Sequence, residues 1–136
     1  MKNAEDFLQA LEKIIAKDSR YKAEAYNFVM SALNYTQAKL KEHRHVTGQE
    51  LLGGIREYGL EQFGPLTRTV FEYWGVKETE DFGNIVFNLV GANLLGKTDG
   101  DSIENFKNGY DFKAVFDKDY RYGMERSQQN GRSNIG

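Results

Sequence analysis

The sequence predicts a mainly α-helical protein that forms one domain over residues 1–116, followed by a polar C-terminal tail over residues 117–136. Three observations predict this fold class. Apolar residues recur at helical spacing over most of the first 98 positions. Each helix expected within residues 46–98 carries its own start and stop signals. Short turns join these helices, so residues 46–98 are expected to form a three-helix core that resembles a helix-turn-helix.

The first 43 residues are expected to form a helical hairpin. Asn3 is a suitable N-cap for the first helix, and Asp18 and Ser19, both good capping residues, predict the turn after it. A longer helix follows over residues 21–42, and an antiparallel hairpin is favoured over one bent helix. The first apolar stripe consists of Phe7, Leu8, Leu11, Ile14 and Ile15, and the second of Tyr21, Ala25, Phe28, Val29, Ala32, Leu33, Thr36 and Leu40.

The third helix has a clear start signal. Thr47 and Glu50 have the spacing of a capping box, and Val46 and Leu51 stand at the two positions of a hydrophobic staple. Three glycines within this helix each cost about 1 kcal/mol relative to alanine, so they predict either a break or a closely packed neighbour. These glycines are Gly53, Gly54 and Gly59, and the expected buried residues are Leu51, Leu52, Ile55, Tyr58 and Phe63.

The fourth and fifth helices are marked by their ends. Pro65 suits the first position of the fourth helix, and Gly75 is expected to end it in a left-handed conformation, with Val76 contacting Phe71. Thr79 is the expected cap of the fifth helix, which Asn93 or Gly96 can end. The buried stripes are expected to be Leu66, Val70, Phe71 and Trp74 in the fourth helix, and Phe82, Ile85, Val86, Leu89 and Val90 in the fifth.

Residues 99–116 allow two interpretations. Asp99-Gly100 and Asn108-Gly109 are hairpin-type dipeptides, so residues 94–98 and 106–112 can form the two strands of a wing. Alternatively, Ser102 caps one short helical turn. The sequence favours neither interpretation over the other.

Composition excludes several classes of protein. The 136 residues carry a net charge of -2, so the whole molecule offers no cationic field to nucleic acid or anionic lipid. The chain contains no cysteine, which excludes disulfides, thiolate metal sites and cysteine nucleophiles. The N-terminal residues are too acidic for a signal peptide, and no apolar stretch has the length of a membrane span. We therefore expect a cytoplasmic protein that does not enter a membrane.

Residues 91–98 match the phosphate-binding pattern GxxxxGK[ST]. Asp99 and Asp101 follow, however, where a helix should begin, and their carboxylates would face the phosphates. The chain also lacks the further βα units of a nucleotide-binding sheet. We expect no nucleotide and no other cofactor, and interpret this segment as the end of a helix.

The two histidines, His43 and His45, could form a weak metal site in an extended segment, but Lys41 and Arg44 nearby repel a cation. A solvated loop is the favoured interpretation, and no metal site is expected. The sequence contains no serine elbow and no isolated carboxylate pair in an apolar setting. We therefore expect no catalytic residues and no enzyme activity.

One face of the second helix is small and uncharged, whereas a solvated helix face is usually rich in lysine and glutamate. Small residues allow close helix approach, so this face is expected to pack against the core or against a partner, with a weakly polar, solvated face as the alternative. It consists of Ala23, Asn27, Met30, Ser31, Asn34 and Ala38.

The polar tail combines arginine and tyrosine with few apolar residues. Such a segment cannot bury enough apolar surface to fold alone, but it can order on a larger surface. We expect it to be an attachment element, through Tyr120, Arg121, Tyr122, Met124, Arg126 and Arg132.

Three stretches carry a resemblance to a family of short bacterial proteins with no assigned function: residues 17–26 (KDSRYKAEAY), 45–52 (HVTGQELL) and 79–87 (TEDFGNIVF). The resemblance extends over residues 18–116. It implies a bacterial source and no activity, ligand or catalytic residue.

These observations favour a non-enzymatic protein-interaction module or an accessory subunit of a larger bacterial assembly, which binds a protein partner or a second copy of itself. The alternative is a nucleic-acid-binding protein, either winged-helix-like or RNA-associated. If the fifth helix were the recognition helix of such a protein, it would present two carboxylates, which repel phosphate. The leading residues of this helix would be Glu80, Asp81, Asn84 and Asn88. A basic patch, either in the tail or around Arg20, Lys39, Lys41 and Arg44, would instead favour nucleic-acid binding.

Overall fold

The computed structural model describes residues 4–42, 44–96 and 103–118, and this part of the chain is helical without any strand. The mainly helical fold class is therefore confirmed. The α-helices are α1 (Ala4–Lys17), α2 (Ala23–Lys39), α3 (Gly48–Phe63), α4 (Thr67–Tyr73) and α5 (Thr79–Gly91). Shorter helical segments are η1 (Gly64–Leu66), η2 (Ile103–Phe106) and η3 (Lys113–Lys118).

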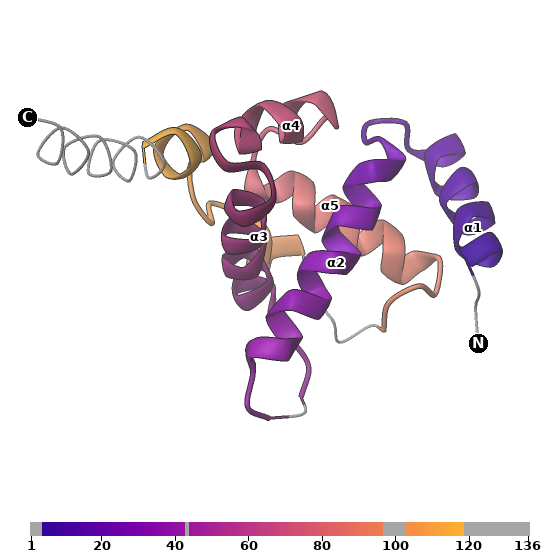
Figure 1. Cartoon of the computed structure of the whole chain (residues 1–136). Helices are drawn as coiled ribbons and strands as arrows, with labels where there is room; N and C mark the ends of the chain where they lie inside the picture. The colour runs from indigo at the N-terminus through magenta and orange to yellow at the C-terminus, as the bar shows by residue number, and fades with distance from the viewer. Residues whose placement is uncertain (1–3, 43, 97–102, 119–136) are drawn as a thin grey trace, which may run out of the picture.

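Helix α2 crosses the middle of the molecule (Figure 1). It packs against α3, α5 and α1, and the chain turns back between α1 and α2, so that the two form separate helices. The expected cap at Asn3 lies outside the described residues. Because α2 contacts both α1 and α3, the N-terminal hairpin and the later helices share one hydrophobic core.

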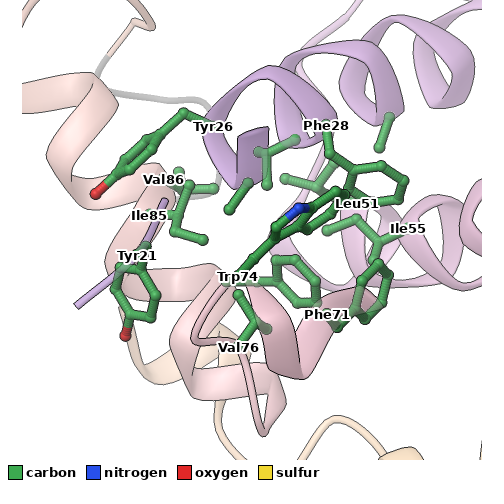
Figure 2. Packing of buried hydrophobic residues seen from close by; sticks show 14 of the residues in the cluster. Tyr21, Tyr26, Phe28, Leu51, Ile55, Phe71, Trp74, Val76, Ile85 and Val86 are labelled. Carbon is green, nitrogen blue, oxygen red and sulfur yellow. The ribbon is translucent and has the colours of Figure 1, made fainter. Parts of the chain in front are cut away.

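Aromatic rings fill the centre of this core. Phe71 lies 5.2 Å from Phe28 and 5.8 Å from Trp74 between ring centroids. Figure 2 shows these rings together, with the hydroxyl groups of Tyr21 and Tyr26 directed away from them. Both tyrosines are nonetheless almost fully buried, so their hydroxyls need partners elsewhere.

The start of α3 is built as its sequence predicts. The Thr47 hydroxyl accepts a hydrogen bond from the Glu50 amide at 3.1 Å, and the Glu50 carboxylate accepts one from the Thr47 amide at 2.9 Å. Val46 and Leu51, the expected staple residues, are both buried. The capping box is therefore confirmed.

Close packing, and not a break, accounts for two of the three glycines in α3. A Cβ atom on Gly54 would overlap the Thr36 hydroxyl of α2, and one on Gly59 would lie 3.0 Å from the Phe71 ring. Gly53 differs, because nothing lies within 4 Å of the position that its Cβ would take.

The turn after α4 also follows its sequence signal. Gly75 has a φ of 94°, and the Val76 amide donates to the Phe71 carbonyl at 2.9 Å, as in a Schellman motif. A Cβ atom on Gly75 would overlap the Arg20 carbonyl. The expected left-handed glycine is therefore confirmed.

The start of α5 differs from its prediction. The N-cap is Glu78, which forms a capping box with Asp81, and Thr79 is the first residue of the helix. The buried Thr79 hydroxyl donates to the Phe106 carbonyl at 2.6 Å and accepts from the Gly109 amide at 3.0 Å. Thr79 thus attaches the segment after α5 to the core. Asn93, with a φ of 61°, follows the end of α5.

A wing is not confirmed. Residues 97–102 lie outside the described part, and residues 106–112, the second expected strand, contain the end of η2 and no strand. One short helical turn stands at Ile103–Phe106, as in the alternative interpretation, although Ser102 itself is not described. Phe112 and Phe116 are both buried, and the ring centroids of Phe116 and Phe71 lie 5.2 Å apart. Residues four apart face the same side in a helical turn, so this segment can bury both rings.

Two residues expected in buried stripes are exposed. Leu8 is 54% exposed and Leu66 is 59% exposed. Leu66 belongs to the 3-10 segment η1, whose three residues per turn put it out of phase with the buried face of α4. Leu8 neighbours the buried side of α1, which is occupied by Leu11 and Ile14.

The adjacent glycines of α3 should respond in opposite directions to the same substitution. Gly53→Ala adds a methyl group in open space and should raise the free energy of unfolding by about 0.5–1 kcal/mol. Gly54→Ala should lower it by about 1–3 kcal/mol, because Thr36 must move. Urea unfolding of both variants tests this, and equal effects would contradict the packing described for α2 and α3.

Candidate interaction surfaces

The hydroxyls of the two buried tyrosines bind the polar side of α5. The Tyr21 hydroxyl donates to the Asp81 carboxylate at 2.5 Å and accepts from the Asn84 amide at 3.0 Å. The Tyr26 hydroxyl accepts from the Asn88 amide at 3.0 Å. This polar cluster fixes the rotation of α5 against the start of α2.

Asp18 extends the polar cluster to the end of α1. Its carboxylate accepts from the Asn88 amide at 2.9 Å and binds the Arg20 guanidinium at 2.7 and 2.8 Å. The hydrogen bonds from Arg20 hold the pKa of Asp18 far below its ordinary range. Burial raises the pKa of Tyr21 and of Tyr26, so both phenols stay protonated.

The polar cluster changes the interpretation of α5 as a recognition helix. Asp81, Asn84 and Asn88 were expected on the leading surface of such a helix, together with Glu80. The first three instead bind Tyr21, Tyr26 and Asp18 inside the molecule, and Glu80 is half-buried. Asp81, Asn84 and Asn88 are therefore half-buried and engaged in hydrogen bonds within the chain.

A groove of about 500 Å³ lies between α1 and α5. Asp18 and Asn88 form part of its wall, so the polar cluster connects the two helices that border it. Apolar side chains contribute most of the rest of the α5 wall. The groove is lined by Asp6, Gln9, Ala10, Lys13, Ile14, Lys17, Asp18, Phe87, Asn88, Gly91 and Ala92.

Phe87 is the most unusual residue of the groove, because this large aromatic side chain is 62% exposed. Sequence analysis did not select it as a site residue. A signal was nevertheless present, since Phe87 lies outside the helical stripe formed by Phe82, Val86 and Leu89. Exposed aromatic side chains are common anchors of protein interfaces.

The small, uncharged face of α2 is exposed over most of its length. Asn27, Ser31, Asn34 and Ala38 are exposed, whereas Ala23 and Met30 are half-buried and contact the core. Packing against the protein's own core therefore does not explain the four exposed residues. A partner and a solvated face are the two interpretations that stay open.

The cations that could have formed a basic patch are mostly neutralised. Arg20 pairs with Asp18 at 2.7 Å, Lys39 with Glu57 at 3.1 Å, and Arg44 with Glu50 at 2.7 Å. Lys41 is exposed and forms no ion pair within the described residues. Asp117 and Lys118, assigned above to the tail, belong to η3, and the Asp117 carboxylate binds the Arg68 guanidinium at 2.8 Å.

Other motifs are only partly described. Gly91 ends α5, whereas Lys97 and Thr98 of the phosphate-binding pattern lie outside the described residues, as do His43 and the tail residues Tyr120, Arg121, Tyr122, Met124, Arg126 and Arg132. Among the described residues, no group of three or more His, Asp or Glu side chains could hold a metal ion. Within the same part of the chain, no helix is long and apolar enough to cross a membrane.

Comparison of the chain with protein-family models, with curated proteins and with solved structures gave no match.

Removing hydrogen-bonding groups from the polar cluster should reveal its contribution to stability. Tyr26→Phe deletes only the hydroxyl and should lower the free energy of unfolding by about 1 kcal/mol. Asn88→Ala removes donors to both Tyr26 and Asp18 and should cost about 1–3 kcal/mol. Tyr73→Phe, at a ring that is 68% exposed, is the control and should leave the melting temperature unchanged. A Tyr26→Phe protein as stable as the control would contradict this account of the cluster.

The capping box of α3 should make the protein sensitive to acid. Hydrogen bonds from Arg44 and from the Thr47 amide lower the pKa of Glu50 from 4.5 to about 2. Because the folded pKa is depressed, the stabilisation is complete above pH 4.5 and is lost as the pH falls toward 2. Glu50→Gln should therefore be less stable than the wild type at pH 7, with the difference shrinking over this window in thermal unfolding. A constant difference across the window would argue against the assigned pKa shift.

Proposed function

We propose that this chain is a non-enzymatic protein-interaction module, an accessory subunit of a larger assembly in the bacterial cytoplasm. The observation that carries the proposal is the groove between α1 and α5, with the exposed Phe87 on its wall. In this proposal the groove receives an apolar side chain or segment of a protein partner, and Phe87 is the anchor residue.

Three properties of the groove support this role. Its volume of about 500 Å³ can accommodate side chains of a partner. Its two bordering helices are tied together through Asp18 and Asn88, so the surface is preorganised and little conformational entropy is lost on binding. An exposed aromatic residue beside small residues such as Ala92 is typical of interface anchors.

The alternative, nucleic-acid binding, has less support. Phosphate recognition requires accessible cations, and three of the four cations of the expected basic patch, Arg20, Lys39 and Arg44, are each paired with a carboxylate. The polar side chains of α5 that would have to contact bases are hydrogen-bonded to Tyr21 and Tyr26. These contacts make a protein partner the better proposal.

Affinity purification from the native host tests the proposal, with Phe87→Asn compared to the wild type. Phe87 is exposed, so its replacement should leave the melting temperature nearly unchanged. Recovery of the partner should fall by at least about tenfold, as expected for an anchor residue. Tyr73→Asn, at an exposed aromatic residue of α4, is the matched control and should retain the partner.

The identified partner is then purified and titrated calorimetrically with the three proteins. Equal binding by wild type and Phe87→Asn would refute the role of the groove. Recovered material that disappears on nuclease treatment would favour the nucleic-acid alternative instead.

A further inference from the structure

Phe87 and Gly91 form a protrusion and a depression on the same face of α5. They stand four residues apart, so they are neighbours along one side of the helix. Phe87 is 62% exposed, and nothing lies within 4 Å of the position that a Cβ atom on Gly91 would take. Both residues line the groove between α1 and α5.

Nothing within the described chain requires glycine at position 91. Gly91 is the last residue of α5 and does not have a positive φ, so its backbone conformation does not require glycine. The chain reverses after α5 through Asn93, which adopts the positive φ, and not through Gly91. Most other glycines of the helices, such as Gly54 and Gly83, have a close neighbour in the same chain that excludes a side chain.

The α1 wall of the groove carries opposite charges toward its two ends. Asp6 lies toward its N-terminal end, and Lys13 and Lys17 lie toward its C-terminal end, beside Asp18, whose charge is paired with Arg20. Within the described residues, neither lysine forms an ion pair. An identical wall that runs in the opposite direction would bring the acidic end of each copy to the basic end of the other.

We propose that the occupant of the groove is a second copy of this chain, related by a two-fold axis through the middle of the groove. Phe87 of each copy packs over Gly91 of the other, and Lys17 of each copy faces Asp6 of the other. In an isologous interface the same surface must carry both the protrusion and the depression, and the groove carries both, as Phe87 and Gly91. This inference rests on the proposed function, because it names the partner of the same groove.

Sedimentation equilibrium tests the proposal directly. The wild type should be a dimer. Phe87→Ala removes the protruding ring, and Gly91→Leu fills the depression, so each should raise the dimer dissociation constant by at least about tenfold. Gly53→Leu is the matched control, since it places the same side chain in open space on α3, outside the groove, and should leave the dimer intact.

Charge exchange provides a second, independent measurement. Lys17→Glu should weaken the dimer, because it places glutamate opposite Asp6 of the other copy. The double variant Asp6→Lys with Lys17→Glu should restore it, since both members of each pair are exchanged. Restoration also shows that the single variant was folded and failed only in its contacts.

Three outcomes would overturn the proposal: a monomeric wild type at the highest soluble concentration, a dimer that survives both Phe87→Ala and Gly91→Leu, or a double variant that is no tighter than Lys17→Glu. The first of these leaves the proposed function intact if Phe87→Asn still loses a different partner. Loss of both the dimer and the Phe87 dependence would remove the groove as an interaction site altogether.

Discussion

The structure depends above all on the hydrogen bonds that the buried hydroxyls of Tyr21 and Tyr26 make to α5. A buried phenol without a hydrogen-bond partner would lower the free energy of unfolding by about 1–3 kcal/mol. The start of α2 therefore requires a neighbouring helix with polar side chains within reach of both hydroxyls. Asp81, Asn84 and Asn88 are such groups, each about one turn from the next. Once these side chains bind the start of α2, Phe82, Ile85 and Leu89 of α5 face the core, and Phe87 lies at the surface. The link from Asn88 to Asp18 then sets α1 beside α5 and creates the groove between them.

Local signals predicted local structure. The capping box of Thr47 and Glu50 and the left-handed Gly75 involve residues within a few positions of one another, so the sequence contains all the information that they need. Long-range contacts explain the errors. Thr79 was expected to cap α5, but its hydroxyl binds the Phe106 carbonyl, 27 residues away, and Glu78 takes the capping position. Long-range contacts also determine the segment after α5, for which the sequence favoured neither a wing nor a helical turn. Phe106, Phe112 and Phe116 of this segment are all buried in the core.

The candidate site was harder to predict than the fold, because the groove joins helices from the two ends of the domain. No pattern within α1 indicates that Lys13 and Lys17 lie across from Phe87. Phe87 alone was accessible to sequence reasoning, as a large aromatic residue outside the apolar stripe of its helix. The uncharged face of α2 was visible in the sequence as an unusual face, and the structure places its residues Asn27 and Ser31 at the surface. Glycines that lack a neighbour, such as Gly91, become informative only when the surrounding space is known.

An intermolecular distance measurement tests the central claim most directly, namely that two copies of the chain meet through the surface formed by α1 and α5. The chain contains no cysteine, so one introduced cysteine gives one spin label per copy. Leu8→Cys places the label on α1 at an exposed position outside the groove lining, and Gly53→Cys places it in open space on α3. Pulsed dipolar spectroscopy should give a narrow intermolecular distance for the α1 label that is clearly shorter than the distance for the α3 label. No intermolecular coupling at either position, or a shorter distance at α3, would contradict the account.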